Sequence, residues 1–143
     1  MTSASGAREY DALRLPEGNW WDWEVIDYDG SRLRLGAGHD LSYYHLLEVV
    51  FTDVSYLRCP TMFMDAVFRA PTREESAEVA RLLGEEPPVL AAFDADAGGG
   101  PPTPCLVAAE AVDVVTGHFP RVGASDVDTS RSQAVKPGSV GAE

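Results

Sequence analysis

The sequence predicts an α+β fold, in which an antiparallel or mixed β-sheet of about six strands carries one helix on a face. Two observations predict it. Between residues 20 and 120, most segments show apolar side chains alternating with polar ones, which is the period of a β-strand. A helical pattern occurs once, between residues 71 and 86, with β-rich runs before and after it. With 143 residues, 45% of them hydrophobic, the chain is long enough to form one core.

The first expected element is a β-hairpin within the segment WWDWEVIDYDGSRLRL. A three-residue loop from Tyr28 to Gly30 puts the glycine at the left-handed position that this class of loop requires. The resulting register sets Val25 opposite Leu33 and separates an apolar face from a charged one. A slip of one residue would mix the two faces, so this register is favoured. The apolar face of the hairpin consists of Trp21, Trp23, Val25, Leu33 and Leu35.

Two β-rich runs follow the hairpin. The first, HLLEVVFTDVSYLRCP, carries apolar residues on both faces, which is typical of a central strand covered on both sides. We expect this strand to bend near Asp53 and to end at Pro60, since proline cannot donate to a ladder. The second run, TMFMDAVFRA, is expected to form a strand with one apolar face. That face consists of Met62, Met64, Ala66 and Phe68.

The segment PTREESAEVARLLGEE carries the signals of a helix with defined ends. Thr72 and Glu75 have the spacing of a capping box, and Gly84 is placed to end the helix in the left-handed conformation. Two more strands are expected after the prolines that follow, VLAAFDA at 89–95 and CLVAAEAVDVVTG at 105–117. The glycine- and proline-rich connection between them is expected to be flexible.

The expected domain spans residues 10–120, between a disordered N-terminus at 1–9 and a disordered tail at 121–143. The N-terminus lacks a signal peptide and no apolar stretch reaches membrane-spanning length, so we expect a cytoplasmic protein. Cys59 and Cys105 form no CxxC motif and are expected to be free thiols in that compartment. Whether a bridge could join them depends on whether their strands are neighbours.

The charge of the chain restricts its partners. Its 23 Asp and Glu residues exceed its 11 Lys and Arg residues, for a formal net charge of -12. The arginines are scattered, whereas nucleic-acid binding needs clustered cations, so nucleic acid is excluded as a partner. The same charge repels an anionic membrane and attracts a basic partner protein or a cationic small molecule. It also keeps a protein soluble by self-repulsion, and it leaves homo-oligomerisation open.

The segment GAGHDLSYYHLLEVVF holds the most concentrated candidate chemistry. His39, Asp40, His45 and Glu48 are usable metal ligands, but the segment lacks an HExxH motif or facial-triad spacing. His45 and Glu48 are also an odd number of residues apart, which points them to opposite faces of a strand. We therefore expect no metal and no cofactor here.

A metal-free acid–base site is the alternative use of the same segment. It would combine His39, Asp40, His45 and Asp53, because histidine titrates near neutrality and a carboxylate can hold its tautomer. Asp53 falls on the apolar side of its strand, where a carboxylate is costly unless paired; otherwise the strand bends there and the carboxylate reaches water. No Ser-His-Asp or GxSxG pattern occurs, and the glycine run before Pro101 precedes no helix and is no phosphate loop.

All three tryptophans fall within four positions. Trp21 and Trp23 are expected in the core. Trp20 shares the charged face with Asp22 and Glu24, and an exposed tryptophan among carboxylates is typical of an interface for a basic partner. The other interpretation places Trp20 under the N-terminal segment.

The motifs WWDWEVI, DGSRLRL and LLEVVFTDVSYL, in this order across residues 20–58, resemble small immunity-type proteins of bacterial polymorphic toxin systems. Those families usually begin the first strand with His-Asp, where this chain has Trp21 and Asp22. The resemblance implies a non-enzymatic protein that neutralises a toxin by binding it, with an acidic surface.

The sequence therefore favours a non-catalytic binding module with Trp20, Asp22 and Glu24 at its surface. The Gly-, Ala-, Arg-, Asp- and Val-rich usage is typical of GC-rich bacteria, where small enzymes of biosynthetic pathways are also common. The alternative is thus a small enzyme of such a pathway, with its His/Asp site in a sheet-lined pocket. A carrier or sensor of a cationic or aromatic ligand is a third, weaker interpretation.

Overall fold

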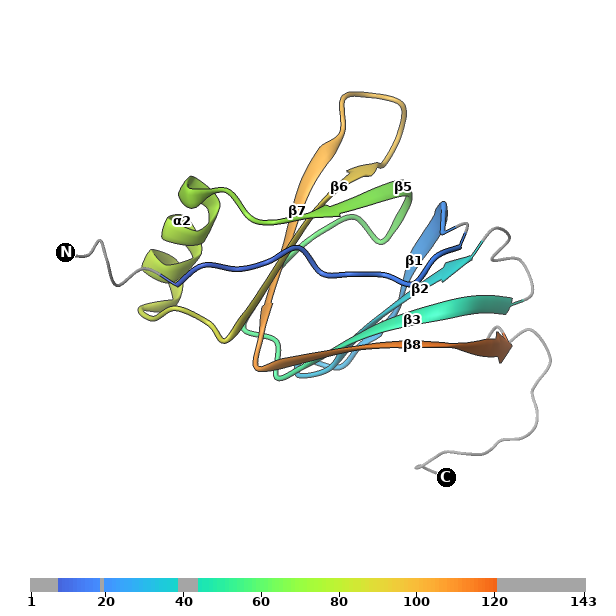
Figure 1. Cartoon of the computed structure of the whole chain (residues 1–143), viewed down its shortest axis with the longest axis horizontal. Helices are drawn as coiled ribbons and strands as arrows, with labels where there is room; N and C mark the ends of the chain where they lie inside the picture. Colours follow the sequence, from blue (N-terminus) through green and yellow to red (C-terminus); the bar gives the residue numbers. More distant parts are fainter. Residues whose placement is uncertain (1–7, 19, 39–43, 121–143) are drawn as a thin grey trace.

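The structure, a computed structural model, describes residues 8–18, 20–38 and 44–120. Most of the expected N-terminal segment 1–9 and the whole expected tail 121–143 lie outside the described residues. The described strands are β1 (Asp22–Tyr28), β2 (Leu33–Gly38), β3 (Tyr44–Thr52), β4 (Tyr56–Arg58), β5 (Met62–Arg69), β6 (Val89–Asp96), β7 (Thr103–Ala109) and β8 (Ala111–Pro120). One helix, α2 (Arg73–Leu83), lies between β5 and β6 (Figure 1).

The α+β class with one helix is confirmed, but the described sheet has eight strands instead of about six. All of its pairings are antiparallel, in the order β4-β7-β6-β5-β1-β2-β3-β8. The difference arises because two expected strands are each divided. The run after the hairpin is divided at Asp53 into β3 and β4, and the last run is divided at Glu110 into β7 and β8.

The two divisions lie side by side and form one corner of the sheet. Asp53 adopts a left-handed conformation with φ of 56°. Across the corner, the N–H of Glu110 donates to the carbonyl of Thr52 at 3.0 Å, and the N–H of Ser55 donates to the carbonyl of Ala108 at 2.8 Å. Both segments of the chain therefore turn together while they stay hydrogen-bonded to each other.

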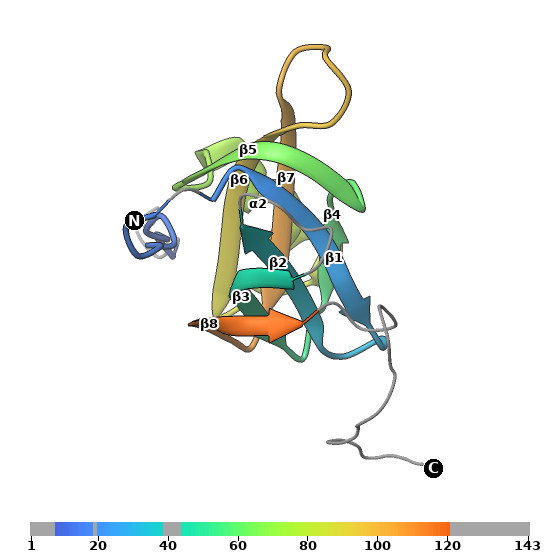
Figure 2. The ribbon, with the colours of Figure 1, turned by 90° about the vertical axis from the view of Figure 1, so that its right-hand side faces the viewer.

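This corner folds the sheet back over itself around one core. Beyond it, β4 pairs with β7, whereas before it β3 pairs with β8. Figures 1 and 2 show the resulting two layers, one containing β1, β2, β3 and β8 and the other containing β5, β6 and β7. The N-terminal segment crosses the open side between the layers, where Leu13 and Leu15 pack against the core (Figure 1). The largest fully buried side chains of the core between the layers are Trp23, Leu33, Leu35, Leu47, Val49, Phe51, Phe93 and Val107.

The helix forms as predicted and covers the outer face of β6 and β7. Thr72 caps its first turn, and Glu75 completes the capping box. Gly84 ends it with φ of 79°. Val79, the buried residue of the helix, packs against Leu90 and Leu106. No helix in the described part of the chain is long and apolar enough to span a bilayer.

An arginine with two carboxylate partners fixes the start of the helix to the sheet. Arg69, the last residue of β5, donates both terminal nitrogens to Glu75, at 2.7 and 2.9 Å. It also donates twice to Asp94 of β6, at 3.1 Å each. Bidentate pairs of this kind fix orientation as well as distance.

The hairpin register differs from the predicted one by two residues up to Val25 and by three residues after it. Val25 lies opposite Leu35, not Leu33, and the predicted three-residue loop is wrong because Tyr28 already pairs with Leu33. The Asp29 carboxylate accepts the N–H groups of Ser31 and Arg32, at 2.9 and 2.8 Å, and so moves the turn along the chain. Between Val25 and Asp27 the pairing with β2 is irregular, so β1 holds one residue more than β2 there. A shift of two keeps the faces, so Trp23, Leu33 and Leu35 are buried as predicted.

The predicted apolar face of the next strand is wrong for half of its members. Met62 and Met64 are exposed, whereas Ala66 and Phe68 pack against the core. The cause is Asp65, which has φ of 53° and lies at a register shift of β5. A bulge of this kind reverses the alternation. Met64 and Ala66 would face the same side in a regular strand, but here they face opposite sides of the sheet.

Candidate functional site

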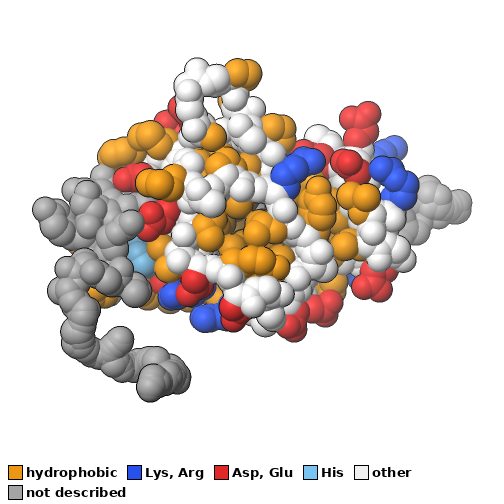
Figure 3. Space-filling view, turned by 180° about the vertical axis from the view of Figure 1, so that it is seen from behind, with side chains coloured by type: hydrophobic (Ala, Val, Ile, Leu, Met, Phe, Trp, Pro, Cys, Tyr) orange, Lys and Arg blue, Asp and Glu red, His pale blue; other side chains and the backbone are white. Residues whose placement is uncertain are grey.

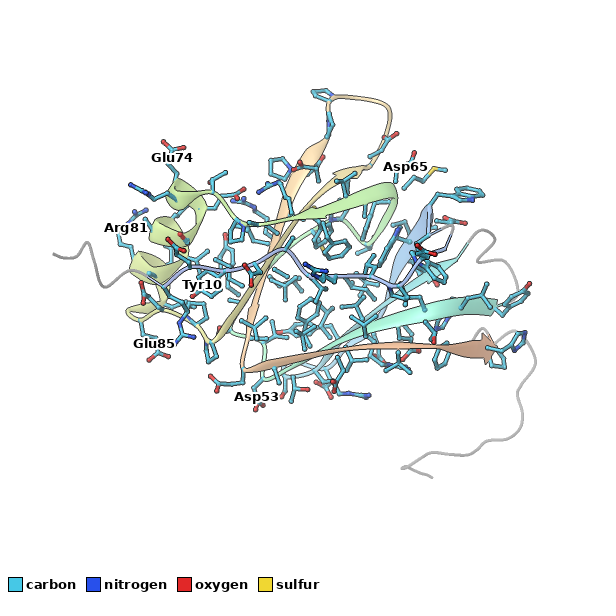
Figure 4. All side chains as sticks on the ribbon, viewed as in Figure 1. Tyr10, Asp53, Asp65, Glu74, Arg81 and Glu85 are labelled. Carbon is cyan, nitrogen blue, oxygen red and sulfur yellow. The ribbon has the colours of Figure 1, made fainter. Side chains whose placement is uncertain are left out.

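The residues of the predicted acid–base site do not come together. His39 and Asp40 lie outside the described residues. His45 lies near the start of β3, and Asp53 follows the end of this strand, which places them roughly 25 Å apart along an extended chain. Asp53 is exposed and accepts a hydrogen bond from the Ser31 hydroxyl at 3.1 Å. Figure 4 shows Asp53 at the corner, away from the interior. The interpretation in which the strand bends and the carboxylate reaches water is confirmed.

His45 instead belongs to a chain of polar side chains across three strands. Its Nε2 lies 2.8 Å from Oε2 of Glu48. The same oxygen lies 3.1 Å from Nη1 of Arg34 in β2, and the other guanidinium nitrogens bind Asp27 of β1 at 2.6 to 3.2 Å. The expectation that His45 and Glu48 face opposite ways is wrong, because the pairing of β3 with β8 is irregular between His45 and Leu47.

The imidazole is held by packing as well as by Glu48. It stacks on Phe119 of β8, with ring centroids 5.0 Å apart and planes inclined by 13°. It also lies over Gly36 of β2, where an added Cβ would come within 3.1 Å of its Cγ and 2.7 Å of Cδ1 of Ile26. The His45 and Glu48 residues are only 5% and 6% exposed. The glycine thus makes the space in which the histidine ring is buried.

The electrostatics of these linked polar side chains favour a structural role for them. Burial alone would raise the pKa of Glu48, but the hydrogen bond from His45 and the charge of Arg34 outweigh it and lower this pKa. The hydrogen bond to Asp27 chiefly raises the pKa of Arg34. A general base works best with a pKa near the operating pH, and Glu48 is shifted away from it. A cavity of about 300 Å³ lies elsewhere, between residues 8–14 and the start of β6.

A different surface carries exposed apolar side chains next to carboxylates. Met62 and Met64 of β5 are 65% and 42% exposed. On one side they lie opposite Glu24 and Asp22 of β1, and on the other side Met64 lies opposite Asp96 of β6. Cross-strand partners on one face are close enough to interact. We call the following set the methionine surface: Trp21, Asp22, Glu24, Met62, Met64, Val67 and Asp96.

Two further apolar side chains extend this surface. Val67 of β5 is 62% exposed, and Trp21 is 41% exposed. The carbonyl of Trp21 accepts the N–H of Asp65 at 2.8 Å, which places the backbone of Trp21 beside β5, next to Met64. Figure 3 shows several separate apolar clusters on the face that it draws, some of them beside carboxylates.

The tryptophans exchange their predicted roles. Trp21 is not in the core as expected, because β1 begins at Asp22 and the alternation of the strand does not extend to it. Trp20 is half-buried under the N-terminal segment, and its indole N–H donates to the carbonyl of Pro16 at 2.7 Å. The other interpretation of Trp20 is therefore confirmed. Trp23 is fully buried as predicted.

Sequence reasoning missed the two methionines, and it missed Arg34 and Asp27 as partners of the buried pair. One signal was available for the methionines: an aspartate inside an apolar strand, here Asp65, indicates a bulge as readily as a buried acid. In the described part of the chain, no group of three or more His, Cys, Asp or Glu side chains could hold a metal ion.

Comparisons with known proteins add no relative. No family model, no curated protein and no solved structure matches this chain.

Proposed function

We propose that this protein is a non-catalytic binding module and that its methionine surface holds a basic partner protein. The observation that carries the proposal is the cross-strand arrangement in which exposed Met62 and Met64 lie directly opposite Glu24 and Asp22. Adjacent apolar side chains that remain in water, bordered by charges of one sign, are characteristic of a protein-binding site.

The side chains suit recognition of a protein. Methionine is flexible and polarizable, so Met62 and Met64 can adapt to an uneven apolar partner. Trp21 offers a large rigid contact of the kind that dominates binding energy at interfaces. The carboxylates at the border select lysine or arginine on the partner and oppose an acidic one.

The net charge supports the same class of partner. At -12, the chain attracts a basic protein over long range and raises its rate of encounter. The resemblance to immunity-type proteins favours a toxin as that partner. The two free thiols, Cys59 and Cys105, favour a reducing compartment, and we place the protein in the cytoplasm.

The proposal is tested with proteins encoded next to this one, each purified and titrated calorimetrically. For the protein that binds, Met62→Ser with Met64→Ser should weaken affinity at least about tenfold, since each removes apolar contact area. Asp22→Lys with Glu24→Lys should weaken it further and make it less sensitive to salt. Asp113→Lys is the matched control, because Asp113 is exposed on β8 at the far end of the strand order. A loss equal to that of the control would reject the methionine surface.

The second candidate is a small enzyme of a bacterial biosynthetic pathway. The buried contact of His45 with Glu48, at 2.8 Å, supports it. Against it, Arg34 also binds this carboxylate, and Asp53 lies at the other end of the strand. Glu48→Gln separates the two candidates: it should abolish turnover in an enzyme and leave partner affinity within about threefold in the binding module.

A further inference from the structure

Cys105 lies in β7, and Cys59 directly follows β4, the strand that pairs with β7 on one side. β4 pairs with β7 so that Tyr56 lies opposite Ala108, and Arg58 opposite Leu106. Cys59 follows Arg58 directly, and one more step of the same register sets it opposite Cys105. The neighbourhood that a bridge between them requires is therefore present.

Both side chains face the interior between the two layers. Leu57 and Cys59 pack against the core cluster to which Cys105 belongs. Directly opposed residues of antiparallel strands have Cβ atoms about 4.5–5.5 Å apart, and a disulfide needs about 3.5–4.5 Å, so a small local adjustment joins them. β4 allows that adjustment, because it is three residues long and pairs only with β7 within the described sheet.

The two thiols differ in access. Cys105 is fully buried, whereas Cys59 is half-buried beside the turn that leads to β5. Burial raises the pKa of Cys59 to about 12, with a further rise from its neighbour Cys105, and burial raises the pKa of Cys105 to about 11. At neutral pH both are protonated, so they react only slowly with oxidants.

We propose that Cys59 and Cys105 are a modification site, at which a low-molecular-weight disulfide oxidises them to a reversible intrachain disulfide. The Cys59 thiolate attacks one sulfur of the oxidant, RSSR, which forms a mixed disulfide and releases one RS⁻. The Cys105 thiolate then attacks the Cys59 sulfur, which forms the Cys59–Cys105 bond and releases the second RS⁻. The two thiol protons end on two RSH, so the oxidant is reduced by the two electrons that the cysteines lose.

The bond would close a loop that contains β5, α2 and β6. It would also fix β4 to β7 beside the corner of the sheet. The inference depends on the pairing of β4 with β7 and on the burial of the two thiols, and it is independent of the methionine surface.

The test incubates the folded, reduced protein with glutathione disulfide and measures its intact mass. Wild type should lose the mass of two hydrogen atoms, and the linked peptides should contain Cys59 and Cys105. Cys105→Ser should stop at the mixed disulfide, with one glutathione on Cys59. Cys59→Ser should react at least about tenfold more slowly, because only the buried thiol remains. The wild-type rate should rise about tenfold per pH unit from pH 7 to 9, as the thiolate fraction grows.

Three results would overturn the inference. The first is a wild type that oxidises only when it is unfolded in urea. The second is a disulfide between two chains, seen on a non-reducing gel. The third is a folded Cys105→Ser protein whose Cys59 stays unmodified. Circular dichroism of each variant checks its fold, and the wild-type mass and peptide map decide the question if a variant fails to fold.

Discussion

Asp53 and Asp65 share one backbone conformation, and each interrupts a run of apolar residues. Of the non-glycine residues that the structure describes, these two alone have positive φ, at 56° and 53°. Asp53 follows the end of β3 at the corner of the sheet, and Asp65 reverses the alternation within β5. Aspartate tolerates this conformation better than most residues because its short side chain can satisfy local backbone groups. Two acids inside apolar runs thus create the corner of the sheet and the exposure of the methionines.

Replacing Asp65 tests whether the bulge is fixed by its conformation. Asp65→Gly should leave the free energy of unfolding unchanged or raise it by up to about 1 kcal/mol, because glycine adopts positive φ without strain. Asp65→Val should lower it by about 1–3 kcal/mol, since a β-branched residue is strained there. Urea unfolding measures both. Asp113→Val, in the regularly paired part of β8, is the control and should change stability little. Equal stability of the glycine and valine variants would contradict the account.

The contact of Arg69 with Glu75 predicts a specific acid sensitivity. The hydrogen bonds from Arg69 chiefly lower the pKa of Glu75 to about 2, from an ordinary value near 4.5. A carboxylate whose folded pKa is depressed stabilises the fold above its ordinary pKa, and this contribution is lost as the pH falls from about 4.5 to 2. Glu75→Gln should therefore cost about 1–2 kcal/mol at pH 7, and this cost should shrink toward pH 2.

The matched control for this contact is Glu74→Gln. Glu74 lies in the same first turn but is exposed and points away from the sheet (Figure 4). Its substitution should cost no more than about 0.5 kcal/mol, through the helix dipole alone. If the two variants lose equal stability at pH 7, Arg69 does not dock the helix as described.

The buried histidine depends on the absence of a side chain at position 36. Gly36→Ala should lower the free energy of unfolding by about 1–3 kcal/mol, because the new Cβ would meet Ile26 and His45 in a packed site. Gly98→Ala is the control, since nothing lies within 4 Å of an added Cβ there. Thermal and urea unfolding measure both variants. A Gly36→Ala protein as stable as the control would show that the His45 ring is not held in this position.

Removing Arg34 should expose the cost of a buried carboxylate. Arg34→Met leaves Glu48 with its His45 contact alone, and we expect a loss of about 2–4 kcal/mol at pH 7. The loss should diminish at acid pH, because the pKa of Glu48 rises in the variant and the group takes up a proton instead of remaining charged. Arg32→Met, at an exposed position near the turn, should have little effect. A loss that is independent of pH would contradict the assignment of Glu48 as the affected group.

Local signals predicted the helix and the faces of the first two strands. The cap at Thr72 and the stop at Gly84 act through neighbouring residues, so the sequence carries them directly. The burial of Trp23 and Leu35 depends only on alternation, which survives a register shift of two.

The positions that sequence reasoning placed wrongly depend on breaks in that alternation. Met64 and His45 each lie next to a register irregularity, and the alternation of apolar residues alone does not predict where a strand bulges. The bend at Asp53 was expected, but its role as a corner of the sheet was not. That role depends on hydrogen bonds between the residues on both sides of Asp53 and the end of β7, which the local sequence does not contain. Candidate sites were therefore harder to predict than the core.

The central claim, that the methionine surface is the binding site, is tested most directly by hydroxyl-radical footprinting of the protein with and without its bound partner. The account predicts that saturating partner reduces the labelling of Trp21, Met62 and Met64 at least severalfold, while Tyr28, which is exposed at the other end of β1, is labelled as before. Unchanged labelling of the two methionines in the saturated complex, or protection centred on Tyr28, would contradict it.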